Sequence, residues 1–203
     1  LYADTVDSDY VNDIITIIDP ILKKGENIII NCVSKSGGTT ETIANFEILV
    51  QVLKKYKKDY EKYVIITSDK NSKLWNFALE KGFDLLEIPK KVGGRYSVFS
   101  PVGLFPLGLL GVNIDQLLKG ASDIKSRCLD INLLTNPAVI SATLIYLHHK
   151  KGKNIHDLFL VGNDLESFGK WYRQLMGESI GKEFSKDKKR VFEGITPTVS
   201  LVS

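Results

Sequence analysis

The chain has 203 residues, and 43% of them are hydrophobic, which is enough to bury a sizeable core. Its 27 basic and 24 acidic residues give a net charge of +3, a balance too even to indicate a nucleic-acid partner. The two cysteines, Cys32 and Cys128, suit reduced thiols in a cytoplasm better than a disulfide framework. The composition therefore predicts a globular, cytoplasmic protein.

Helices and strands alternate along the first part of the chain, and Gly25, Gly82 and Pro89 stand where element ends are expected. The predicted order is a helix over residues 8–24, a strand over 27–33, a helix over 39–57, a strand over 63–68, a helix over 72–81 and a strand over 84–88. Alternation of this kind predicts an α/β fold with a doubly wound parallel sheet.

A more helical region follows. The apolar segment over residues 98–114 is broken by prolines and glycines and is short for a membrane span, so it predicts a buried, kinked helix and no membrane partner. The further predicted elements are helices over 113–125 and 137–151, a strand over 158–161, a helix over 165–177 and an extended segment over 195–203. The strand and helix after residue 158 predict the start of a second α/β unit.

The two ends of the sequence are abrupt. It opens at Leu1, its single methionine is Met176, and it finishes in an extended segment rather than a polar tail. We therefore expect residues to be missing at both ends, so that the chain is a piece of a longer protein.

Residues 34–42, with the sequence Ser-Lys-Ser-Gly-Gly-Thr-Thr-Glu-Thr, join an apolar strand to an amphipathic helix. A helix start offers unpaired backbone N–H groups and the positive end of the helix dipole, and serine and threonine hydroxyls add donors. The helix is predicted to bury one stripe against the sheet, formed by Ile43, Phe46, Val50 and Leu53. This junction predicts a binding site for a phosphate group.

Two other interpretations of this junction are a nucleotide-binding site and a purely structural turn. The nucleotide-binding patterns G-x-G-x-x-G and G-x-x-x-x-G-K-[ST] are absent, which favours a small phosphorylated ligand over a nucleotide. A purely structural alternative is that Ser36 caps the helix and the glycines only turn the chain.

A second group of candidates is Gly93-Gly94-Arg95-Tyr96-Ser97. Glycines before Arg95 allow the backbone to approach a ligand, and the guanidinium offers a fork of donors to an oxyanion. The structural alternative is an arginine in a surface loop.

The third group lies near the end of the chain. Gln174 and Glu178 are four residues apart, so they share one face if the helix continues through them. A carboxylate near a helix end, flanked here by Gly177 and Gly181, can act as a general base, although a lone glutamate is more often a solvated side chain.

Together these segments resemble the glucose-6-phosphate isomerase (phosphoglucose isomerase) family. The resemblance rests on residues 34–42, on Gly-Gly-Arg-Tyr-Ser at 93–97 and on Gln-Leu-Met-Gly-Glu-Ser-Ile-Gly-Lys at 174–182, and it runs over nearly the whole chain. The first motif alone indicates the sugar isomerase (SIS) fold, and the other two are specific to the isomerase. The resemblance implies a first SIS domain over residues 1–120, a helical bridge over 121–152 and the beginning of a second SIS domain over 153–203.

The resemblance also implies a function, the interconversion of glucose 6-phosphate and fructose 6-phosphate through a cis-enediolate, in a homodimer of carbohydrate metabolism. By motif, Glu178 would transfer the proton, Arg95 would stabilise the enediolate and Gln174 would help to hold the sugar. The phosphate would be bound by Ser34, by Lys35 through its backbone, and by Ser36 and Thr39. No metal or organic cofactor is implied.

Some family residues have no match here. The family opens the sugar ring with a histidine from a partner subunit and a lysine near its C-terminus, so His148, His149 and His156 receive no role. The alternatives left open by the sequence are a non-catalytic SIS module that senses a sugar phosphate, and an isomerase that also accepts mannose 6-phosphate.

Overall fold

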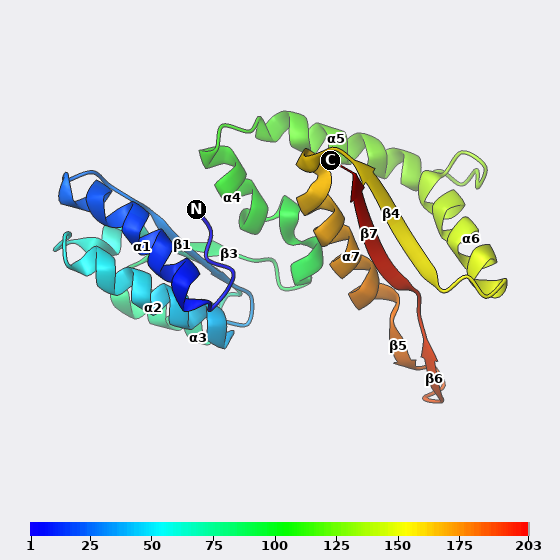
Figure 1. Cartoon of the computed structure of the whole chain (residues 1–203), viewed down its shortest axis with the longest axis horizontal. Helices are drawn as coiled ribbons and strands as arrows, with labels where there is room; N and C mark the ends of the chain where they lie inside the picture. Colours follow the sequence, from blue (N-terminus) through cyan, green and yellow to red (C-terminus); the bar gives the residue numbers. More distant parts are fainter. Residues whose placement is uncertain (203) are drawn as a thin grey trace. The chain divides into compact units, whose positions relative to one another are not determined.

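The computed structural model describes residues 1–202, and the chain divides into two compact units, Leu1–Val112 and a second unit that begins at Asn113. Each unit combines helices with a parallel sheet, which confirms the predicted α/β class with parallel sheets (Figure 1). Within residues 1–202, none of the helices has both the length and the apolar character needed to cross a membrane. The finer division at residues 120 and 152 stays a prediction.

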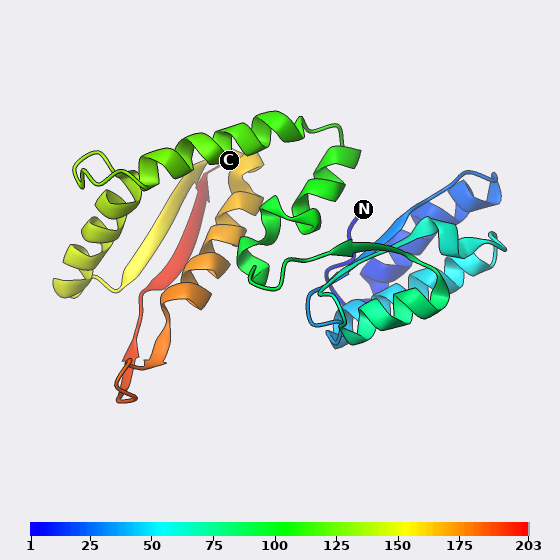
Figure 2. The same ribbon diagram turned by 180° about the vertical axis from the view of Figure 1, so that it is seen from behind.

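The first unit is built on a parallel sheet in the order β1-β2-β3. Its strands are β1 (Ile30–Ser34), β2 (Val64–Ser68) and β3 (Asp84–Glu87), and its helices are α1 (Ser8–Lys23), α2 (Thr40–Lys54) and α3 (Lys73–Lys81), with a short 3-10 helix η1 (Tyr60–Tyr63) before β2. The helices α2 and α3 connect consecutive strands, and α1 packs on α2 (Figures 1 and 2). The predicted order of elements over residues 8–88 is confirmed.

The core of this unit lies between its helices and one face of the sheet. Phe46, Val50 and Leu53 of α2 are buried there, with Ile43 packed at its edge, as the predicted stripe requires. The Cys32 thiol of β1 is also buried, and desolvation raises its pKa to about 12. Both cysteines are free thiols, in agreement with the sequence interpretation.

The apolar segment after β3 differs from its prediction. A 3-10 helix, η2 (Gly94–Phe99), comes first, and a separate helix α4 (Pro101–Leu109) follows. The break is at Ser100, whose hydroxyl accepts a hydrogen bond from the backbone N–H of Val102, so that Ser100 caps the helix and Pro101 begins it rather than kinking it. No residue of α4 is buried among the described residues, so the prediction of one buried helix over 98–114 is wrong.

The second unit contains a parallel pair of strands joined through a helix. Its elements are α5 (Ile114–Cys128), α6 (Pro137–Lys150), β4 (Ile155–Val161), a 3-10 helix η3 (Asn163–Leu165), α7 (Glu166–Ile180), β5 (Lys182–Phe184), β6 (Arg190–Glu193) and β7 (Thr196–Val202). The strands β4 and β7 pair in parallel along their whole length, and α7 packs on β7. The predicted strand-then-helix unit is therefore confirmed, and Ser203, the last residue of the predicted extended segment, lies outside the described residues.

The helix α7 lies very close to its sheet at Gly169. A Cβ atom at this position would stand 2.7 Å from Cγ1 of Val199 in β7 and 2.8 Å from Cδ1 of Leu160 in β4. A larger residue there would force these side chains or the helix to shift. The glycine thus lets α7 lie close against the side chains of β4 and β7.

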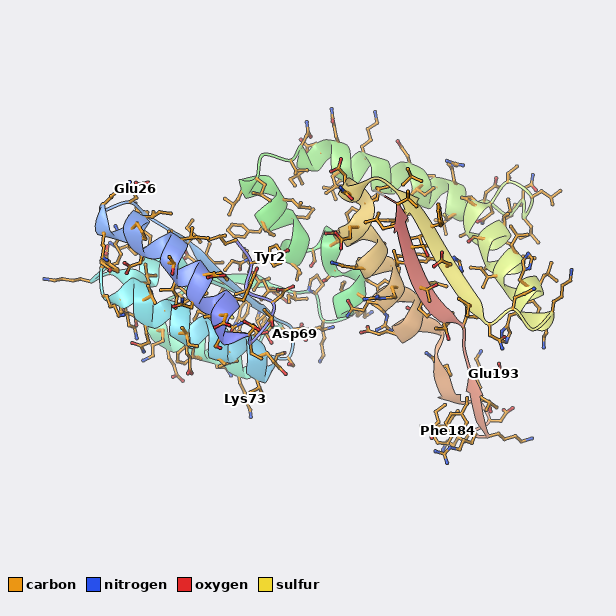
Figure 3. The ribbon with its side chains drawn as sticks, viewed as in Figure 1. Tyr2, Glu26, Asp69, Lys73, Phe184 and Glu193 are labelled. Atoms are coloured by element: carbon orange, nitrogen blue, oxygen red, sulfur yellow. The ribbon has the colours of Figure 1, made fainter. Side chains whose placement is uncertain are left out.

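A small antiparallel hairpin, β5–β6, stands between α7 and β7 and was not predicted. Phe184 and Glu193 belong to this hairpin (Figure 3). Its turn is rich in lysine, and this charged run interrupts the alternation of polar and apolar residues that marks strands, so the local pattern does not predict a hairpin there.

Replacing Leu53 with alanine is expected to lower the free energy of unfolding by about 2–5 kcal/mol, because a fully buried side chain is lost and a cavity is left. The matched control is Leu79→Ala, which removes the same atoms from a helix of the same unit at a side chain that is 60% exposed, and should cost less than about 1 kcal/mol. Urea unfolding followed by circular dichroism measures both. Equal losses would contradict the core described above.

Candidate functional site

The polar loop of the first unit begins where β1 and β2 end side by side. Ser34 and Ser68 are partners in the parallel register, and both are buried. The Ser68 hydroxyl donates to the Ser34 carbonyl over 2.6 Å and lies 2.7 Å from the hydroxyl of Ser72, which caps α3. These contacts from β2 and from the start of α3 hold the first residue of the loop in place.

The four residues predicted to bind phosphate, Ser34, Lys35, Ser36 and Thr39, all lie in this loop. The hydroxyls of Ser34 and Thr39 are 3.1 Å apart. Thr39 is the N-cap residue of α2, yet its side chain makes no capping hydrogen bond. Two hydroxyl groups therefore stand together at a helix start, where the helix dipole favours an anion.

Ser36 does not cap the helix. Its hydroxyl accepts a hydrogen bond from the backbone N–H of Gly38 over 3.3 Å, inside the loop, and the helix begins after Thr39. The structural alternative in which Ser36 serves as the cap is therefore wrong. The Ser36 side chain is exposed at the surface of the loop.

Gly37 is the residue that seats the loop on α3. Its φ angle is +65°, in the left-handed region, and a Cβ atom would lie 2.7 Å from the backbone nitrogen of Leu74 and 2.8 Å from the Ser72 hydroxyl. Only glycine meets both conditions without strain. Gly38, its neighbour, has open space where its Cβ would be.

Arg95 lies in η2 of the same unit, where its guanidinium carbon is 5.2 Å from the centre of the Tyr96 ring. The segment around it is held by hydroxyl groups: Ser97 donates to the Gly94 carbonyl over 2.6 Å, and Ser100 donates to the Ser97 carbonyl over 2.6 Å. Ser97 and Ser100 are both buried. The backbone that carries Arg95 is thus ordered by its own side chains.

Gln174 and Glu178 belong to the second unit. The helix α7 continues through both, and the Gln174 amide donates to Oε1 of Glu178 over 3.0 Å. The predicted shared face is confirmed. The hydrogen bond orients a solvent-exposed carboxylate near the C-terminal end of the helix.

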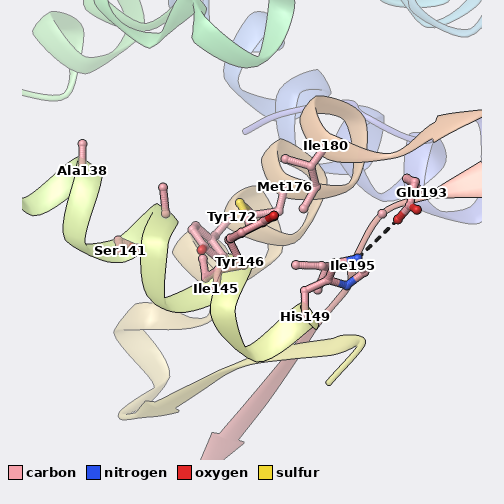
Figure 4. A pocket seen from close by; sticks show the side chains of 12 residues that line it. Ala138, Ser141, Ile145, Tyr146, His149, Tyr172, Met176, Ile180, Glu193 and Ile195 are labelled. Carbon is pink, nitrogen blue, oxygen red and sulfur yellow. Dashed lines mark hydrogen bonds and ion pairs between the residues drawn. The ribbon is translucent and has the colours of Figure 1, made fainter. Parts of the chain in front are cut away.

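A cavity of about 570 Å³ in this unit lies against another face of α7 (Figure 4). Its lining is mainly apolar and includes Tyr172 and Met176 of α7. At one end Nε2 of His149 is 3.3 Å from Oε2 of Glu193. Neither Gln174 nor Glu178 lines this cavity.

Within residues 1–202, no group of three or more histidine, cysteine, aspartate or glutamate side chains could hold a metal ion.

Sequence reasoning missed Ser68 and Ser72, the two residues that support the loop from β2 and α3. The signal was present, because Ser68 closes an apolar strand next to Ser34 in a parallel sheet, and carboxyl ends of parallel strands meet at one edge. Ser72 stands three residues before Trp75, whose backbone N–H donates to the Ser72 hydroxyl over 3.0 Å, in a typical N-cap arrangement.

These features place the chain in the class of α/β proteins whose polar loops stand at the carboxyl ends of parallel strands. Within that class, the chain belongs to the phosphoglucose isomerase family, because a family model of that description matches residues 2–199.

Individual relatives agree with this assignment. The chain is 36% identical over 200 residues to the glucose-6-phosphate isomerase of Carboxydothermus hydrogenoformans, a match that covers 98% of this chain and 42% of that protein. It is 39% identical over 183 residues to that of Methanocaldococcus jannaschii, with coverages of 89% and 43%. The chain thus spans less than half the length of these curated relatives.

Solved structures show the same fold. A crystal structure of a hypothetical protein from Thermus thermophilus matches with a TM-score of 0.87 and 33% identity, over 99% of this chain and 46% of that one. A crystal structure of a glucose-6-phosphate isomerase from Chlamydia trachomatis matches with a TM-score of 0.77 and 23% identity, over 85% of this chain and 34% of that one.

Gly37→Ala is expected to lower the free energy of unfolding by about 1–3 kcal/mol, because the new methyl group forces both a left-handed φ and a contact with the α3 backbone. Gly38→Ala makes the same chemical change one residue away in open space and should cost less than about 1 kcal/mol. Urea unfolding of the two variants measures the difference. Similar stabilities would contradict the close packing of the loop on α3.

Proposed function

We propose that this chain contributes to the isomerisation of glucose 6-phosphate and fructose 6-phosphate. Membership of the phosphoglucose isomerase family supports this proposal, as does the similarity to curated glucose-6-phosphate isomerases. The observation that carries it is the loop at the start of α2, where the Ser34 and Thr39 hydroxyls lie 3.1 Å apart. That arrangement suits the phosphate group that both sugars share.

In this proposal the phosphate is bound by the Ser34, Ser36 and Thr39 hydroxyls and by the backbone of Lys35. Neutral donors at a helix start bind an anion without burying a second full charge. They hold the end of the substrate that does not react, so the binding energy they supply is available for orienting the carbons that do.

The proton transfer is assigned to Glu178. Its carboxylate removes the proton from C2 of the open-chain aldose, and the electron pair forms the C1=C2 bond as the C1 carbonyl oxygen becomes an oxyanion. A proton then passes from the C2 hydroxyl to the oxygen on C1, which leaves the negative charge on the oxygen at C2. The carboxylic acid returns its proton to C1 as the C2=O bond forms, which gives the ketose. Gln174 orients the carboxylate through its amide and helps to hold the sugar. Arg95 stabilises the negative charge on the enediolate oxygens, which develops only along the reaction path.

The proposed partners and setting follow from the same family. Both hexose phosphates are substrates, the protein acts as a homodimer in the cytoplasm, and the ring-opening groups are not supplied by His148, His149 or His156. A sensing module that binds a sugar phosphate without turnover would use the loop over residues 34–39, called the phosphate loop below, and would have no need of Glu178.

The decisive experiment is a Glu178→Gln substitution in the complete gene product. Deuterium uptake from solvent at C1 of fructose 6-phosphate and C2 of glucose 6-phosphate should fall by about 10²- to 10⁴-fold, because the amide cannot accept the proton. Sugar-phosphate binding measured by calorimetry should persist.

The control is Glu166→Gln on the same helix, since Glu166 is exposed and pairs with Lys170 over 2.8 Å at the opposite end of α7. It should exchange deuterium at the parental rate. Exchange that survives in Glu178→Gln would refute the assignment of the base, and binding without any exchange in the parent protein would favour the sensing module.

A further inference from the structure

The side chain of Lys35 links two segments that are distant in the sequence. Its ammonium nitrogen donates to the backbone carbonyl of Lys90 over 3.1 Å and to that of Val92 over 2.5 Å. Because the phosphate role proposed above uses only the backbone of Lys35, the side chain is available for this second task. It bridges the phosphate loop and the turn that leads to Arg95.

The turn itself is held by one backbone hydrogen bond to the neighbouring strand and by one local bond. At its start the backbone N–H of Ile88 donates to the Ser68 carbonyl over 2.9 Å, and the Val92 N–H closes the turn by donating to the Pro89 carbonyl over 2.8 Å. Lys90 and Lys91 are exposed to solvent. The Lys35 ammonium therefore reaches the turn at the side that continues into Gly93.

From Val92 to Arg95 the backbone is short and ordered. The N–H of Tyr96 donates to the Gly93 carbonyl over 3.0 Å, and the buried Ser97 hydroxyl donates to the Gly94 carbonyl. Because few residues separate Val92 from η2, a displacement of Val92 would also move the start of η2, the helix that contains Arg95. The two carbonyls that Lys35 binds, those of Lys90 and Val92, thus lie only a few residues before Arg95.

The chemistry of the ammonium suits this bridge. It has three donors around one nitrogen, so it can bind two carbonyls at once, and hydrogen bonds from a charged donor are stronger than those between neutral groups. Both acceptors are neutral carbonyls, so the ammonium keeps its positive charge in the same unit as the phosphate loop.

We propose that Lys35 is a positioning residue: its side chain holds the turn at residues 90–93 against the phosphate loop and so sets where Arg95 stands relative to the bound phosphate. This inference rests on the proposed function. In this proposal the backbone of Lys35 binds the phosphate, and its side chain positions Arg95, which stabilises the enediolate. Lys35 thus couples substrate binding to the placement of Arg95.

The test is Lys35→Met in the complete gene product, which keeps most of the length of the side chain and removes its donors. The expected result is a fall in kcat of about 10- to 100-fold, since small misplacements of a catalytic group have effects of this size. The dissociation constant for inorganic phosphate, measured by calorimetry, should rise by less than about threefold, because the backbone and hydroxyl donors remain. Lys35→Arg, which restores a charged donor, should recover part of kcat.

The matched controls are Lys90→Met and Lys91→Met. They remove the same charge from the turn itself but leave its backbone carbonyls in place, so kcat should stay at the parental value. If kcat is unchanged in Lys35→Met while the dissociation constant for phosphate rises in step with KM, the ammonium binds the phosphate directly and the proposal is wrong.

A second readout does not depend on isomerase activity. Amide hydrogen exchange over residues 89–96 should be faster in Lys35→Met than in the parent protein and in Lys90→Met. Equal exchange in all three proteins would overturn the positioning role. Faster exchange in a protein that shows no isomerisation would uphold the bridge and refute the proposed function, so the two failures are distinguishable.

Discussion

The end of β1 is tied to the end of β2 by a serine hydroxyl that has no access to water. Ser68 is fully buried, and a buried hydroxyl without a partner is costly, so its hydrogen bonds with the Ser34 carbonyl and the Ser72 hydroxyl stabilise the fold. The parallel register places these two residues opposite each other. The loop that follows Ser34 is therefore constrained at its origin, and the start of α2 and the seat of Gly37 on α3 depend on that constraint.

Charge is distributed unevenly among the candidate residues. The phosphate loop offers hydroxyl and backbone donors, whereas the full positive charges of Lys35 and Arg95 are engaged with backbone carbonyls and with an aromatic ring. In the proposed site, neutral donors bind the unreactive phosphate. The Arg95 guanidinium is then kept for the charge that appears only during the proposed reaction, which is the condition under which a cation lowers a barrier rather than merely tightening binding.

Local periodicity explains what the sequence could predict. The stripe of Phe46, Val50 and Leu53 and the Gln174–Glu178 pair follow from helical spacing alone, and the phosphate loop follows from its place between a strand and a helix. The bridge from Lys35 to Val92 spans 57 residues and leaves no mark on local pattern. The β5–β6 hairpin was not predicted and the burial of α4 was predicted wrongly for a related reason, since both depend on which surfaces meet in three dimensions.

The glycine of α7 at position 169 bears on Glu178 from nine residues away, roughly 13 Å along the helix axis. At that point the helix backbone packs against the Val199 and Leu160 side chains of the sheet. A methyl group at position 169 would force those side chains or the helix to shift, and a shift of the helix would move Glu178 with it. The position of the carboxylate therefore depends on how closely the helix approaches its sheet two and a half turns earlier. Sequence variation at position 169, although remote from any substrate, can in this way change where the proposed base lies.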